Sequence, residues 1–426
     1  MNIPNKTFKE QDALTPLSRK QYLFPLILIT SLFFFWGFVH NLDPILIPHL
    51  RKAFKLTDLE SSLVDFSVFI AYFVMAMPAG YLMRKWGYKT GIIVGLLLFA
   101  IGSFLFIPAA DTKMYAFFLG ALFVIACGLA VLETAANPYV TILGPAKTAD
   151  FRLNFSQSFN GLAAFLAPII GAKYIFTEAG YNEAQVKAMS PAAYDAYVTA
   201  EAASVKGPYI ILGTVIILVL VLFIFTKLPD IKSDPDEEKS KVSDALQFRN
   251  LRWGIVAQFF YVGAQVCVLS FFVRFVVVSA NIDENAAAVY AGFAGLAFML
   301  GRFVGTFFMK FLPSKQLLSI YSIICILLTL VAIFGEGSIT IYALIGVSFF
   351  MSIMFPTIFS LGISGLGEHT KTGSSLIVMA IVGGAILPLL LGYISDVTHS
   401  IQYGYLVPLI CFAVVSLFSK NVKTQI

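Results

Sequence analysis

The run Asp230-Ile-Lys-Ser-Asp-Pro-Asp-Glu-Glu-Lys-Ser-Lys241 is the only long charged stretch in this chain of 426 residues. Six long apolar segments precede it and six follow it, each near the roughly 20 residues that a helix needs to cross about 30 Å of hydrocarbon. We therefore predict an all-α membrane protein of twelve transmembrane helices. They form two pseudo-symmetric six-helix bundles, separated by a solvated linker.

The composition supports a membrane protein. Hydrophobic residues make up 58% of the chain and charged residues only 12%, whereas a soluble domain has about 25% charged residues. There is too little charge to solvate a globule of this size. The four cysteines lie in apolar runs without close pairing, which indicates small buried side chains rather than disulfides or a zinc site.

The predicted helices follow the apolar segments along the chain. They lie near residues 22–50, 60–83, 89–108, 114–143, 152–176, 207–227, 252–280, 286–311, 316–335, 338–362, 373–395 and 402–419. The corresponding regions are an N-terminal segment (1–21), a first bundle (22–229), a linker (230–251), a second bundle (252–420) and a tail (421–426). A second polar insert, about Glu178 to Lys206, separates the fifth and sixth helices.

The basic residues predict the orientation. With the N-terminus in the cytoplasm, the inner segments hold 20 of the 29 Lys and Arg residues and the outer loops hold 7. The positive-inside rule therefore places both termini in the cytoplasm. The net charge of +5 comes from this bias and gives no reason to expect a nucleic-acid partner.

Glu133 is the first candidate for a functional residue, in the run Leu132-Glu-Thr-Ala-Ala-Asn-Pro138. A charge within a membrane is costly and usually faces a cavity. Desolvation disfavours the ionised carboxyl, so we expect Glu133 to exchange a proton near neutral pH. Asn137 lies on the same helix face. The alternative is a structural carboxyl group bonded to a neighbouring helix.

Two aspartates are further candidates for proton coupling. Asp43 lies between His40 and Pro48, where prolines break the first helix, and Asp65 lies early in the second helix. A carboxylate at a helix end that meets headgroups or water is the alternative for both.

The fifth predicted helix carries an amide at every third position: Asn154, Gln157 and Asn160. These amides form a polar stripe that offers donors and acceptors to sugar hydroxyls. Contacts that hold helices together are the other interpretation.

The seventh helix repeats Gln258, Tyr261 and Gln265 on one face, where Tyr261 and Gln265 are candidate sugar ligands and packing is the alternative. Arg274 lies farther along the same segment. Arg84 and Arg302 are candidate gating residues. For Arg302, expected near the cytoplasmic end, a gate salt bridge and snorkelling both fit.

No enzyme signature is present: the sequence has no Walker loop, no metal-spaced histidine cluster and no nucleophile elbow. We expect no enzymatic activity and no cofactor. Active transport without a nucleotide site must draw on an ion gradient.

The stretch around Glu133 resembles the L-fucose:proton symporter family of the major facilitator superfamily, which also includes glucose/galactose and N-acetylglucosamine permeases. Further similar stretches are Phe33-Phe-Phe-Trp-Gly37, Arg152-Leu-Asn154, Gln157-Ser-Phe-Asn160, Tyr261-Val-Gly-Ala-Gln265, Gly301-Arg-Phe-Val-Gly-Thr306, Phe355-Pro-Thr-Ile-Phe-Ser-Leu-Gly362 and Gly373-Ser-Ser-Leu-Ile-Val-Met379. The resemblance covers nearly the whole chain.

The resemblance implies a major facilitator fold with a central sugar site, alternating access, and a monomer in the bacterial inner membrane. It also implies that a glutamate matching Glu133 and an aspartate of the first helix handle the proton and the sugar. The chain departs from the family pattern at two carboxylates, which bear on which ion and which sugar it uses. Asp43 stands one residue earlier than the family's aspartate, whose position Pro44 occupies, and Asp65 replaces a glutamine.

We therefore expect a cation-coupled importer of a monosaccharide, with L-fucose and protons favoured. Glu133 would bind the sugar, Asp43 would exchange the proton, and Asn154, Gln157, Asn160 and Gln265 would orient hydroxyls. The alternatives are sodium-coupled glucose, galactose or N-acetylglucosamine uptake with Asp43 and Asp65 as ligands, a small-molecule exporter, and a receptor that does not transport.

Overall fold

A computed structural model describes residues 19–42, 46, 50, 53–56, 58–175, 185–186, 188–228 and 242–422, and these residues form helices and no strand. The first bundle consists of α1 (Arg19–His40), α3 (Asp58–Thr112), α4 (Tyr115–Ile142), α5 (Ala149–Ile175) and α7 (Pro191–Phe225). The second consists of α9 (Arg249–Ser270), α10 (Phe272–Ala280), α11 (Glu284–Phe308), α12 (Ser314–Phe334), α13 (Ser338–Met351), α14 (Met354–Ile363), α15 (Thr370–Met379), α16 (Gly383–Thr398), α17 (Ile401–Gly404) and α18 (Leu406–Asn421). Short elements are η1 (Ala146–Thr148), α8 (Val242–Ala245), η3 (Gly367–His369) and η4 (Ala380–Val382).

The helices account for the twelve predicted spans. Ten segments of the described chain are long and apolar enough to cross a membrane, and one of them, Leu63–Thr112, has 50 residues. It contains two spans that meet at Gly87, whose φ of 79° is not helical. The Tyr115 hydroxyl donates to the Glu60 carbonyl at 2.6 Å, so the chain has returned to the end where α3 began. The polar helix α5, with 27 residues, completes the set.

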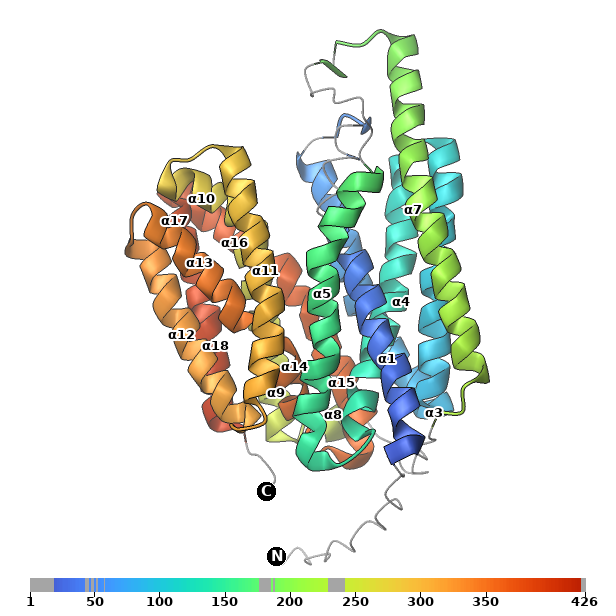
Figure 1. Ribbon diagram of the computed structural model, residues 1–426, viewed down its shortest axis with the longest axis vertical. Helices are drawn as coiled ribbons and strands as arrows, with labels where there is room; N and C mark the ends of the chain where they lie inside the picture. The colour runs from blue at the N-terminus through green and yellow to red at the C-terminus, as the bar shows by residue number, and fades with distance from the viewer. Residues whose placement is uncertain are drawn as a thin grey trace, which may run out of the picture.

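The second polar insert was expected to precede the sixth helix, but the structure shows that its last part is helical. Ser190 caps the N-terminus of α7 by accepting a hydrogen bond from the Ala193 amide at 3.4 Å, and Pro191 occupies the first turn. Lys113 pairs with Asp195 at 2.6 Å and holds the projecting turns of α7 (Figure 1). Composition alone did not reveal this extension, because its residues are too polar to span a membrane.

Three predicted spans of the second bundle are broken helices. The span 252–280 is divided into α9 and α10 at Phe271, the span 338–362 into α13 and α14, and the span 373–395 into α15 and α16 with η4 between them. Irregular backbone at membrane depth is tolerated where protein surrounds it. Ser352 and Ile353, between α13 and α14, are fully buried.

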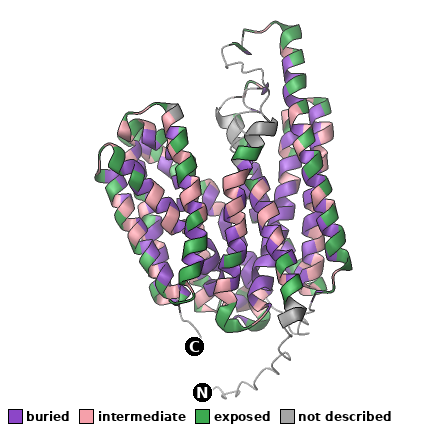
Figure 2. Ribbon diagram, in the orientation of Figure 1, coloured by how far each residue is buried: buried purple, intermediate pink, exposed green. Residues whose placement is uncertain are grey.

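The two bundles stand side by side and are in contact at one end (Figure 1). We call this the terminal end, because α1 begins there and α18 ends there. Helices α14 and α15 of the second bundle pack there against α3, α4 and α5 of the first. Large apolar side chains such as Ile211 and Leu389 are exposed, as expected where hydrocarbon surrounds a protein. Exposed positions run along the outer helices of both bundles (Figure 2). All four cysteines are free and buried, as predicted.

Candidate functional site

Glu133 lies in the most deeply buried part of α4, where every residue from Ile125 to Thr141 is buried. Its side chain is 8% exposed, and the Tyr72 side chain from α3 forms a hydrogen bond with its carboxyl group. The positive charge of Arg302 also acts on Glu133, from the second bundle. The predicted buried carboxyl group is therefore found between the bundles, with a hydroxyl group and a cation as its surroundings.

Arg302 links the two bundles. Its Nη1 atom donates to the Gln157 main-chain oxygen at 2.5 Å, and to the Gln157 Oε1 and Asn160 Oδ1 atoms at 3.2 Å each. Its Nε atom donates to the Ser352 carbonyl at 3.1 Å, and the guanidinium lies 4.8 Å from the Phe298 ring centre.

Of the two alternatives for Arg302, a gate salt bridge and snorkelling, the structure contradicts snorkelling. Its side chain is only 4% exposed and is held among amides and carbonyl groups from both bundles. The position of Arg302 along its own helix could not predict this burial, because the oxygen atoms that accept its hydrogen bonds belong to α5 and to the break after α13.

The amide stripe of α5 lies at the interface between the bundles. Gln157 donates to Asn137 on α4 at 3.1 Å, and Asn154 donates to Thr357 on α14 at 3.2 Å. Asn160 is half-buried and faces Arg302. The Asn137 Nδ2 atom is buried without a hydrogen-bond partner among the described residues, so it is a donor available to a ligand or to another conformer.

The polar face of α9 is less open than the sequence suggested. Tyr261 is fully buried and donates to the Met351 carbonyl at 2.9 Å, so in this conformer its hydroxyl supports the backbone before the α13–α14 break. Gln265 is half-buried. Gln258 is fully buried, and neither atom of its amide has a partner within the described residues.

Asp65 is not part of this cluster in the described structure. Asp43 lies outside the described residues. Asp65 has an exposed side chain near the start of α3, two turns before Tyr72. Arg274 is also remote: it lies in α10, is 57% exposed and is 3.7 Å from Asp396.

A second set of contacts joins the bundles at the terminal end. Asp150 of α5 accepts hydrogen bonds from Ser360, at 2.5 Å, and from Ser314, both in the second bundle. Ser374 of α15 donates to the Thr134 carbonyl at 2.9 Å, one residue beyond Glu133.

Arg84, predicted to act in gating, donates to Thr372 across the same interface at 3.3 Å. Close approach of the helices is possible because Gly80 has no side chain: a Cβ atom there would lie 1.8 Å from the Ser375 hydroxyl oxygen.

The sequence interpretation missed Tyr72 and Asp150. Tyr72 is seven residues after Asp65 and therefore on nearly the same helix face, which was a usable signal. Asp150 precedes the amide stripe by four residues, but its serine partners come from distant parts of the chain, so no local pattern pointed to them.

Comparison with known proteins agrees with this arrangement. Residues 26–388 match the model of the Major Facilitator Superfamily. The chain is 40% identical to the L-fucose-proton symporter of Escherichia coli K12, over 98% of this chain and 97% of the relative. It is 42% identical to a glucose/galactose transporter of Brucella abortus, over 94% of each chain.

A crystal structure of a Major Facilitator Superfamily transporter, FucP, in the outward conformation has a TM-score of 0.89 with this structure. The two chains are 39% identical, and the match covers 95% of this chain and all of that one. With the family model, the close relatives and the fold in agreement, this chain belongs to the Major Facilitator Superfamily.

Proposed function

We propose that this protein is a secondary active importer of a monosaccharide, that it couples uptake to protons, and that L-fucose is its substrate. The observation that carries the proposal is the position of Glu133: a buried carboxyl group on α4 of the first bundle that is under the charge of Arg302 from the second. The likeness to the L-fucose-proton symporter supports the choice of substrate and ion.

The arrangement accommodates the Glu133 carboxyl group in both of its protonation states. When the carboxyl group is ionised, Arg302 balances its charge across the interface. When it is protonated, that attraction is lost, and Arg302 keeps only its hydrogen bonds to α5 and Ser352. Proton binding therefore weakens one link between the bundles, and a ligand that prefers the other conformer shifts the population towards it.

The sugar site that we propose is formed by the amides around Arg302. Asn137 provides an unpartnered donor, and Asn160 and Gln265 are the half-buried amides. Gln157 and Asn154 hold the arginine and Thr357, and are released for the substrate only if those contacts rearrange. Asp43 and Asp65 remain proposed participants in proton exchange.

The test is uptake of L-fucose into vesicles that contain the purified protein, with an imposed pH gradient. We expect accumulation when the outside is the more acidic side and none when the gradient is collapsed. Uptake that does not respond to collapse of the gradient would contradict proton coupling.

A second candidate function is uptake of glucose or galactose coupled to sodium. The likeness to the glucose/galactose transporter favours those sugars, and the two aspartates that depart from the fucose pattern are oxygen donors of the kind that a cation binds. Counterflow of fucose, galactose, glucose and N-acetylglucosamine, each with and without sodium at fixed pH, distinguishes the two.

The orientation is also a proposal. The excess of Lys and Arg supports a cytoplasmic location for both termini, and thus for the terminal end where the bundles meet. In this orientation the structure is closed to the cytoplasm. Protease cleavage of a C-terminal tag in inside-out but not in right-side-out vesicles is the expected result. We further propose that the protein acts as a monomer in the bacterial inner membrane.

A further inference from the structure

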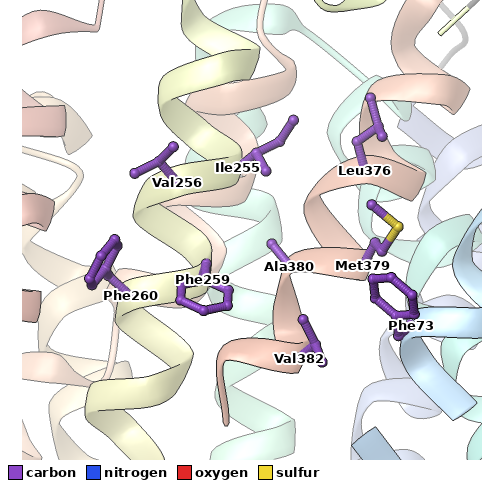
Figure 3. Close-up of a pocket in the computed structure, with 9 residues that line it drawn as sticks. All are labelled: Phe73, Ile255, Val256, Phe259, Phe260, Leu376, Met379, Ala380 and Val382. Carbon is purple, nitrogen blue, oxygen red and sulfur yellow. The ribbon is translucent and has the colours of Figure 1, made fainter. Parts of the chain in front are cut away.

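A groove lies between the two bundles, and none of its lining residues belongs to the site described above (Figure 3). It has a volume of about 260 Å³, and its walls come from α3, α9, α15 and η4. Every lining residue is apolar: Phe73, Ile255, Val256, Phe259, Phe260, Leu376, Met379, Ala380 and Val382. It therefore occupies the seam where the broken helix α15–η4 meets the first bundle.

The groove is open rather than enclosed. Val256 is 42% exposed and Phe73 is 43% exposed. Phe73 directly follows Tyr72, which points to Glu133, and its outward neighbour Val74 is 52% exposed. Val256 is two residues, or about 200° of helix, from the buried Gln258. Phe73 and Val256, the two exposed residues of the groove, thus point in other directions than Tyr72 and Gln258 on their helices.

The membrane determines what fills this groove. All of its residues belong to apolar segments long enough to span a bilayer: Leu63–Thr112, Arg249–Ser270 and Gly367–Thr398. Its walls offer water no side-chain hydrogen-bond partner. The volume is below the roughly 300–1,000 Å³ of clefts that bury whole small molecules. A segment of a lipid acyl chain satisfies all three conditions.

A cation lies at one end of the groove. Arg252 of α9 is exposed and stands three and four residues before Ile255 and Val256, hence on the groove face one turn nearer the terminal end. Among the described residues, no hydrogen bond or ion pair occupies its guanidinium. A basic residue at the edge of the hydrocarbon attracts anionic headgroups.

We propose that this groove binds an acyl chain of an anionic phospholipid whose headgroup lies at Arg252. Phe73 belongs to the first bundle and the other walls belong to the second, so the shape of the groove depends on how the bundles are placed. A bound chain therefore stabilises the conformer in which the terminal end is closed.

The experiment uses native mass spectrometry of the full chain in detergent, titrated with dioleoyl phosphatidylglycerol or dioleoyl phosphatidylcholine. We expect one phosphatidylglycerol to bind more tightly than phosphatidylcholine. Val256→Trp fills the groove and is expected to weaken binding of both lipids at least about tenfold. Arg252→Gln is expected to reduce the preference for phosphatidylglycerol about fivefold, the effect of one basic side chain near an anionic surface.

The matched control is Val331→Trp, because Val331 is 36% exposed on α12 outside the groove. Equal lipid binding by Val256→Trp and Val331→Trp would overturn the groove as the site, and an unchanged lipid preference in Arg252→Gln would overturn the headgroup position. Phe73→Leu changes the opposite wall without adding bulk. Weaker binding by this variant supports the site if Val256→Trp fails to fold, and unchanged binding opposes it.

Discussion

Arg302 of the second bundle donates to both the main-chain oxygen and the side-chain oxygen of Gln157 in the first, at 2.5 and 3.2 Å. One guanidinium thus fixes both the backbone and the amide of the central residue of the α5 stripe. The Gln157 amide in turn donates to Asn137, one turn after Glu133. Arg302 of the second bundle is thus connected through Gln157 to the residue one turn after Glu133.

We expect Arg302→Lys to lower sugar uptake at least about tenfold. Lysine retains the charge but lacks the planar fork that reaches Gln157, Asn160 and Ser352 together. Initial uptake rates at saturating pH gradient measure the effect. Arg274→Lys, at an exposed position of α10, should remain near wild type. Equal rates for the two variants would contradict a central role for Arg302.

Glu133→Gln should separate coupling from exchange. Glutamine imitates the protonated carboxyl group, so counterflow should continue within a few-fold of wild type while accumulation driven by a pH gradient is lost. For the wild type, uptake should rise as the outside becomes more acidic, because protonation there loads the carrier. In Glu133→Gln this dependence should be flat. Glu368→Gln, at an exposed position, serves as the control.

Gln258→Met should increase stability. The amide of Gln258 is buried without a partner in the described structure, and such a group costs about 1–3 kcal/mol, whereas methionine fills a similar volume. Thermal unfolding in detergent measures the change. Gln402→Met is the opposite case, because the Gln402 amide donates to the Ala332 and Gly335 carbonyls at 3.0 and 2.9 Å; this variant should be destabilised. A lower melting temperature in Gln258→Met would show that its amide has a partner in the protein.

Gly80→Ala should oppose closure of the terminal end. The added carbon would lie 1.8 Å from the Ser375 hydroxyl oxygen and 3.0 Å from its Cβ atom, so the Ser375 hydroxyl must turn away and α3 and α15 must move apart by a few tenths of an ångström. Overpacking of this kind costs about 1–3 kcal/mol, which shifts a two-state equilibrium about five- to 150-fold. Distances between spin labels on the two bundles report the shift. Gly207→Ala, where an added carbon meets nothing within 4 Å, should leave the distances unchanged.

The membrane-spanning helices were predictable because their cause is local. A helix in hydrocarbon must satisfy its own backbone hydrogen bonds and present apolar side chains along about 20 residues, so α4 and α12 are readable from composition within a few residues of their ends. The same reasoning identified Glu133 as buried and α5 as a polar helix. Reasoning from composition did not predict the extension of α7 or the breaks beside η4, because neither changes the apolar pattern that a membrane span requires.

The sequence by itself determined which segments enter the membrane and which carboxyl group, Glu133, is buried there. Tertiary structure alone decided the partners of that group: Tyr72 from α3 and Arg302 from α11. It also decided that Arg302 is buried rather than directed to the headgroups, and that Asp150 joins the bundles through serines more than 160 residues away. The physical reason is that hydrophobicity is a property of a segment, whereas the neutralisation of a buried charge depends on the other helix that faces it.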